Sequence, residues 1–118
     1  MRYKFICYKK CSTCQKAKKW LESNDIEFEE RPIKEENPTE IELKEWKEKS
    51  GYAIKRFFNT SGTLYKDLNL KEKLNNMSEE EQIKILSTDG MLVKRPVIVG
   101  DDIVLVGFKE EEWKLKLL

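Results

Sequence analysis

The stretch YKFICYKKCSTC, residues 3–14, decides the fold because its pattern changes from strand to helix within a few residues. Tyr3, Phe5 and Cys7 occupy alternate positions, which predicts a short strand over residues 3–7. A polar turn then leads into a helical pattern, so strand and helix are joined directly at a pair of cysteines.

The helix is expected to begin near Cys11 and to end around Asn24. Its apolar face recurs at three- and four-residue spacing and consists of Cys14, Ala17, Trp20 and Leu21. Residues 26–33 predict a second strand, although Pro32 cannot donate to a hydrogen-bond ladder at its end. The chain therefore opens β-α-β.

Residues 37–88 predict a group of short helices separated by breakers. Asn37 or Thr39 caps the first helix and Gly51 ends it. Residues 59–62, Asn-Thr-Ser-Gly, predict a break, and Leu70, Leu74 and Met77 mark another helix. The sequence SEEE at residues 78–81 is a capping box that opens the last one. Because no strand pattern interrupts this region, we expect a helical insertion over about 37–88.

After the insertion the pattern returns to strands. Residues 97–99 and 103–106 are β-branched runs joined across the turn GDD at 100–102, which predicts a β-hairpin. Residues 109–117 predict a final helix. The order β-α-β, helices, β-β-α indicates an α/β fold in a single domain, 1–118, with the insertion packed on or beside the sheet.

The composition describes a solvated surface without a dominant charge. The 118 residues include 23 Lys and Arg and 22 Asp and Glu, for a net charge of +1. A nucleic-acid-binding protein would show a basic stripe, so we expect no direct contact with nucleic acid. No secretory signal or membrane-length apolar run is visible, which favours a cytoplasmic protein.

The three cysteines lie close together, at positions 7, 11 and 14. An odd, clustered set does not resemble the disulfide framework of a small secreted domain, and a redox or reactive role fits better. Zinc is the competing interpretation, but the chain has no histidine and no second cysteine pair. We therefore expect no metal and no cofactor.

Cys11 lies where a strand meets the N-terminus of a helix, a position that stabilises an anion and lowers the pKa of a thiol. Cys14 lies one helical turn further on and can form a disulfide with it. The alternative is that these cysteines are small buried apolar residues, which their frequent burial allows. Cys7 alternates with strand residues and is expected to be structural.

A second candidate is Arg95, in the sequence Lys94-Arg95-Pro96 directly before a predicted strand. A guanidinium there could stabilise a thiolate or bind an oxyanion through two hydrogen bonds. The alternative is an ordinary turn with a solvated arginine. Pro96 starts the strand and could have a cis peptide bond, which the sequence alone does not decide.

The chain resembles the family of ArsC-type arsenate reductases and Spx-type regulators. The resemblance is carried by the CSTC motif at 11–14, the helical middle, Lys94-Arg95-Pro96 and Val106-Gly107-Phe108. The resemblance covers nearly the whole chain and implies a thioredoxin-like fold with a helical insertion. It matches Cys11 to the cysteine that attacks arsenate and Arg95 to an arginine of the oxyanion site.

The chain departs from the reductase pattern at two positions. Those reductases resemble one another in using three arginines around the oxyanion, but Asn59 stands at the position of the first. No arginine follows Gly107 and Phe108 after the last strand. Because charged hydrogen bonds to an oxyanion contribute about 1.5–3 kcal/mol each, the resemblance implies weak arsenate binding.

Two functions follow from the resemblance. The first is a thiol-disulfide oxidoreductase in which Cys11 attacks a disulfide, sulfenic acid or oxyanion, Cys14 resolves the adduct and Arg95 holds the thiolate or the bound anion. Glutathione, glutaredoxin or thioredoxin would be the thiol reductant. The second is an Spx-type redox-sensing regulator that binds the RNA polymerase α-subunit, with Cys11 and Cys14 as the switch. A scaffold that has lost the chemistry is the third alternative.

Overall fold

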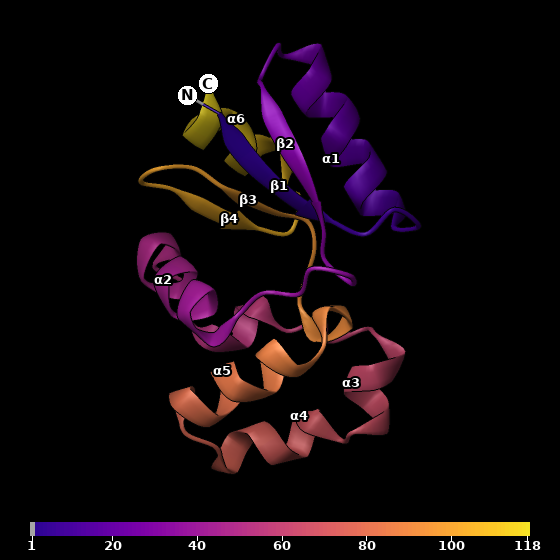
Figure 1. Cartoon of the computed structure of the whole chain (residues 1–118), viewed down its shortest axis with the longest axis vertical. Coiled ribbons are helices and arrows are strands. Elements are labelled where there is room, and N and C mark those ends of the chain that lie inside the picture. Colours follow the sequence, from indigo (N-terminus) through magenta and orange to yellow (C-terminus); the bar gives the residue numbers. More distant parts are fainter. Residues whose placement is uncertain (1) are drawn as a thin grey trace.

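Four strands form one mixed sheet in the order β2-β1-β3-β4 in the computed structural model, which describes residues 2–118 (Figure 1). Strand β1 (Tyr3–Cys7) pairs in parallel with β2 (Phe28–Pro32) and antiparallel with β3 (Val97–Val99). Strand β4 (Val104–Val106) completes the hairpin with β3. The α/β class and the order of helices and strands along the chain predicted from the sequence are confirmed.

The alternation of side chains along β1 separates two apolar clusters, one on each face of the sheet. Phe5 and Cys7 pack with helices α1 (Ser12–Ser23) and α6 (Glu110–Leu117). Ile6 points to the opposite face and packs with the helical middle of the chain. The pattern that predicted the strand therefore also assigns Cys7 to the α1 side.

The middle of the chain is helical, as predicted, and lies beyond one face of the sheet (Figure 1). Its elements are α2 (Glu40–Ser50), η1 (Ile54–Phe57), α3 (Thr63–Asp67), α4 (Leu70–Lys73), η2 (Leu74–Asn76), α5 (Glu79–Thr88) and η3 (Gly90–Leu92). Thr39 and Ser78 form the capping boxes of α2 and α5, and Gly51 adopts the left-handed conformation that ends α2. Between residues 2 and 118, no helix is both long and apolar enough to cross a membrane.

Two boundaries differ from the prediction. The short helix α3 begins directly after Gly62, where the sequence indicated only a break, and it buries Tyr65. The helix expected from Leu70 to Met77 divides into α4 and a 3-10 turn. Short helices of this kind are held by packing of single apolar side chains, and their propensity signal is weak.

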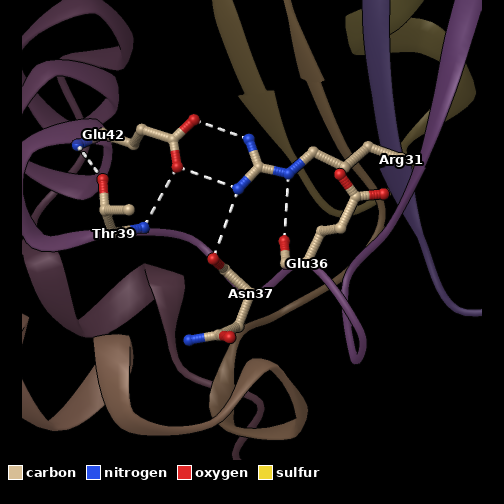
Figure 2. Close-up of polar contacts among 5 residues, drawn as sticks. All are labelled: Arg31, Glu36, Asn37, Thr39 and Glu42. Atoms are coloured by element: carbon tan, nitrogen blue, oxygen red, sulfur yellow. Dashed lines mark hydrogen bonds and ion pairs between the residues drawn. The ribbon is translucent and has the colours of Figure 1, made fainter.

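The partly buried Arg31 joins the sheet to the helical insertion. Both outer nitrogens of Arg31, at the end of β2, donate to the carboxylate of Glu42 in α2, at 2.5 and 2.8 Å (Figure 2). The same guanidinium donates to the backbone carbonyls of Glu36 and Asn37. The Asn37 side chain in turn donates to the carbonyl of Ser87 at 2.6 Å, so the network ties β2, α2 and the end of α5 together.

This network predicts a stability loss for Glu42→Gln. The variant keeps the size of the side chain but removes the charge that Arg31 binds, and charged hydrogen bonds contribute about 1.5–3 kcal/mol. We expect urea unfolding at neutral pH to show a free energy of unfolding lower by about 1–3 kcal/mol. Glu45→Gln is the matched control, because Glu45 is 56% exposed and pairs with Lys49 within one helix.

The same loss should depend on pH. The hydrogen bond from Arg31 holds the pKa of Glu42 at about 2, below its usual 4.5. A group whose pKa is lowered by folding stabilises the protein above the unfolded pKa and loses that contribution as pH falls. The difference between wild type and Glu42→Gln should therefore be full above about pH 5 and close toward pH 2; a difference that persists undiminished at pH 2 would contradict the assignment.

Candidate active site

Cys11 is the N-cap residue of α1, in the predicted position between β1 and the helix. Its backbone is extended and its side chain makes no capping hydrogen bond, which leaves the sulfur available to other partners. The turn is fixed by a hydrogen bond from the Cys11 N–H to the carbonyl of Tyr8 at 3.0 Å. The side chain is half-buried.

The surroundings of Cys11 favour the thiolate. Partial burial opposes ionisation, but the backbone N–H and thiol of Cys14, the backbone N–H of Thr13 and the charge of Arg95 outweigh it. The pKa of Cys11 therefore lies below its ordinary value. This is the expected effect of the first amides of a helix on an anion at its N-terminus.

Cys14 and Cys7 have the opposite character. Both are buried, and all three cysteines are free thiols in this structure. Burial raises the pKa of Cys14 to about 12 and that of Cys7 to about 11. The Cys14 sulfur accepts a hydrogen bond from the Tyr8 N–H at 3.4 Å, so Cys14 is held beneath the turn that carries Cys11.

Arg95 lies at the same site although 84 positions separate it from Cys11 in the sequence. Its guanidinium lies 5.2 Å from the centre of the Tyr8 ring and donates weakly to the carbonyl of Val93. Its Nε atom is buried and has no hydrogen-bond partner. The peptide bond between Arg95 and Pro96 is cis.

Cys11 and Arg95 both line a cavity of about 480 Å³ between the sheet and the helical insertion. Four cationic side chains line it and, within residues 2–118, no carboxylate does: the cations are Arg56, Lys94, Arg95 and Lys109. Residues 59–62, which include Asn59, also line the cavity. The cavity is therefore suited to an anionic ligand beside the thiol.

Sequence reasoning missed Arg56 and Lys109 as cavity residues. Arg56 lies in η1, with its guanidinium 3.8 Å from the centre of the Tyr52 ring and 3.6 Å from a carboxylate oxygen of Glu112 in α6. Nothing near Arg56 in the sequence indicates this position, because it depends on contacts between distant segments. Lys109 follows Gly107 and Phe108, where only the absence of an arginine was noted.

Gly107 leaves the space that Lys94 occupies at this cavity. The glycine has a φ of +76°, and a Cβ on it would lie 2.9 Å from Cε of Lys94. We expect Gly107→Ala to lose about 1–2 kcal/mol of stability from the left-handed backbone and to displace Lys94. Gly51→Ala is a matched control, since Gly51 has a φ of +73° and open space around it.

Both variants should lower the melting temperature similarly in calorimetry. Only Gly107→Ala should change how strongly salt slows the reaction of Cys11 with an anionic thiol reagent, because only this substitution moves a cation of the cavity. Identical salt dependence in the two variants would show that Lys94 does not act on the site.

Replacing Arg95 tests the electrostatic coupling to Cys11. Arg95→Met removes a charge that favours the thiolate, so the pKa of Cys11 should rise and the pH profile of iodoacetamide alkylation should move to higher pH. Lys10→Met is the control because Lys10 is exposed and screened by solvent. A profile that moves equally in both variants would remove the special role of Arg95.

The described part of the chain offers no cluster of metal ligands to this site. Within residues 2–118, no group of three or more His, Cys, Asp or Glu side chains is arranged to hold a metal ion. The chemistry available here is that of a half-buried thiol, a buried neighbouring thiol and several cations.

The comparisons place this arrangement in a family. The model of the ArsC family matches residues 7–115. The chain belongs to the ArsC family. ArsC family relatives include YusI of Bacillus subtilis, 53% identical over 97% of both chains, and the regulatory protein MgsR of Bacillus subtilis, 32% identical over 92% of this chain and 84% of that one.

A solved structure of an ArsC family related protein from Bacteroides fragilis is 56% identical and superimposes with a TM-score of 0.95, covering 98% of this chain and 97% of that one. ArsC membership and this likeness confirm the resemblance stated from the sequence and the thioredoxin-like α/β fold.

Proposed function

We propose that the chain is a thiol-disulfide oxidoreductase in which Cys11 is the nucleophile, Cys14 the resolving thiol and Arg95 the cation that holds the thiolate or the bound anion. The observation that carries this proposal is the pairing of an activated, half-buried thiol at a helix N-terminus with a buried thiol one turn further on. This pairing is the arrangement that thiol-disulfide exchange requires.

The reaction proceeds by two exchanges. The Cys11 thiolate attacks one sulfur of a substrate disulfide, forms a mixed disulfide and releases the other half of the substrate as a thiolate. Cys14 then loses its proton to solvent and attacks the Cys11 sulfur, which releases the second half and leaves a Cys11–Cys14 disulfide. A thiol reductant of the glutathione, glutaredoxin or thioredoxin type, present in the reducing cytosol, returns the pair to its thiols.

The cavity supports an anionic substrate. Arg56, Lys94 and Lys109 line the wall around Cys11 and Arg95. No carboxylate of the described residues lines this wall, and of these three cations only Arg56 pairs with a carboxylate among those residues, that of Glu112. The half-burial of the site strengthens these interactions relative to bulk water. A disulfide or an oxyanion that carries negative charge would therefore bind in preference to a neutral one.

A pair of chromogenic disulfides tests the proposal. Dithiobis(nitrobenzoate) carries two negative charges and dithiodipyridine carries none, and both release a coloured thiolate or thione. We expect Cys11 to react with the anionic disulfide faster, relative to a free cysteine peptide, and we expect this preference to shrink as salt rises from about 0.01 to 1 M. Equal relative rates at low salt would refute the anionic cavity.

A redox-controlled regulator is the second candidate, favoured by the 32% identity to the regulatory protein MgsR. In this case the Cys11–Cys14 disulfide changes a surface that engages a partner, for which the Spx-type resemblance suggests the RNA polymerase α-subunit. Purified α-subunit should then bind the reduced and oxidised chains with different affinities in calorimetry. Absence of binding by both forms would contradict this second candidate.

A further inference from the structure

Cys7 shares a second cavity with the buried cysteine of the pair. This cavity has a volume of about 230 Å³ and is lined by both Cys7 and Cys14, whereas Cys11 lines the larger cationic cavity. An ion pair at the smaller cavity joins Lys18 to Glu30 at 2.6 Å. Cys14 therefore has two other thiols near it: Cys11, which lines the larger cavity, and Cys7, which lines the smaller one.

The hydrogen bond of Cys14 sets an upper limit on the distance between its sulfur and the backbone of Cys7. The sulfur is 3.4 Å from the backbone nitrogen of Tyr8. That nitrogen is bonded to the carbonyl carbon of Cys7, so standard bond lengths place the Cys14 sulfur within about 6 Å of the Cys7 Cα. A disulfide requires the two sulfurs to lie about 2.05 Å apart, so closing the bond needs the side chains of Cys7 and Cys14 to move toward each other within their shared cavity.

The two cysteines also face each other across the same layer. Cys7 points from β1 toward α1, and Cys14 lies on the buried face of α1, in one apolar cluster. The Cys14 thiol is also near enough to Cys11 to help lower the pKa of Cys11. Cys14 therefore lies near both of the other cysteines, which is what transfer of a disulfide between them requires.

We propose that Cys7 is a third redox cysteine, which accepts the disulfide of the oxidised Cys11–Cys14 pair. This inference rests on the proposed function, because that function forms the pair. Cys7 loses its proton to solvent and its thiolate attacks the sulfur of Cys14. The Cys7–Cys14 bond forms, the Cys11–Cys14 bond breaks, and Cys11 leaves as a thiolate; the exchange needs no further oxidant.

The properties of the thiols favour this direction. A thiolate of low pKa is the better leaving group in thiol-disulfide exchange, and Cys11 has the lowered pKa of the three. Cys7, with a pKa of about 11, is a strong nucleophile once ionised but is ionised rarely near neutral pH. The transfer should be slow, should accelerate with pH, and should restore a reactive Cys11 while the chain remains oxidised.

Peptide mapping distinguishes the two disulfides, because trypsin separates residues 5–9, which contain Cys7, from residues 11–16, which contain the other two cysteines. The reduced wild-type protein is treated with one equivalent of diamide, freed of reagent, incubated at several pH values, and capped with N-ethylmaleimide before digestion. An internal disulfide in 11–16 indicates Cys11–Cys14. A linkage between the two peptides, with Cys11 capped in the fragment spectrum, indicates Cys7–Cys14.

We expect the internal disulfide to appear first and the linked peptides to replace it, at a rate that rises about tenfold for each pH unit between about pH 7 and 9. Cys7→Ala should keep the internal disulfide, with Cys11 protected from capping. Its folding is checked by its unfolding curve, and the wild-type experiment does not depend on it.

Three other outcomes overturn the inference. If only the internal disulfide is found in wild type up to pH 9, Cys7 accepts nothing and the proposed function stands without it. If the linked peptides carry a capped Cys14, the bond joins Cys7 to Cys11 and the transfer through Cys14 is wrong. If no disulfide forms at all, the proposed function fails together with this inference.

Discussion

Cys11→Ser should lower the rate of reaction with dithiobis(nitrobenzoate) by about 1000-fold or more at pH 7. The two remaining thiols are buried and have pKa values of about 11 and about 12. At pH 7 a thiol with a pKa near 11 is ionised to only about one part in ten thousand, so neither residue can replace an activated thiolate. The rate is measured by stopped-flow absorbance of the released thiolate.

The control for this substitution is Ser23→Ala, an exposed change at the other end of α1 that should keep the wild-type rate. Mass spectrometry after a short iodoacetamide pulse provides a second reading, with modification of Cys11 in the control and slow modification of Cys7 in both proteins. If Cys11→Ser reacts as fast as wild type, the nucleophile has been assigned to the wrong cysteine.

Cys14→Ser should stop the reaction after its first half. In a single turnover without reductant, the wild-type protein should release about two thiolates rapidly, one on attack by Cys11 and one on resolution by Cys14. The variant should release about one and retain a mixed disulfide. In the wild-type protein, Cys14 attacks the mixed disulfide at a high effective concentration because both are in the same chain. The variant lacks this thiol, so its release of the second thiolate should be slower by about 100-fold or more.

Ser12→Ala is the matched control, because Ser12 lies in the same helical turn and is exposed. It should release the second thiolate at the wild-type rate, and intact-mass measurement should find no persistent adduct. A Cys14→Ser protein that still releases about two thiolates rapidly would mean that Cys14 is only a buried apolar residue, the alternative that the sequence left open.

The strand and the start of the helix in residues 3–14 could be predicted because the spacing of apolar residues there matches the residues that the structure buries. Alternation correctly predicted the strand β1, and the spacing from Cys14 to Leu21 correctly identified the buried side of α1. The caps at Thr39, Gly51 and Ser78 were also predicted, because a cap is decided by neighbours in the sequence.

The charges of the cavity could not be predicted in the same way. Arg56 reaches the cavity from η1 and Lys109 from the segment before α6, and their proximity to Cys11 depends on how the insertion packs against the sheet. The position of Asn59 pointed only to a missing arginine, whereas the structure places other cations around the same space. Charge near a site is a property of the tertiary fold, so a count of arginines in the sequence underestimates it.

Cys7 shows a further limit of sequence patterns. Its alternation with Phe5 correctly placed it in a strand, and for this reason we expected a structural role. The pattern could not reveal that Cys7 and Cys14 line one cavity, because that depends on how α1 crosses the sheet.

The most direct test of the account is a redox titration of the wild-type protein in glutathione buffers, with acid quenching, thiol trapping and mass spectrometry to identify the bonded cysteines. We predict a reversible two-electron couple between about −180 and −300 mV, in which Cys14 is one bonded partner at every oxidised point. Protein that remains fully reduced across this range, or a disulfide that excludes Cys14, would contradict the claim that these cysteines form a working redox pair.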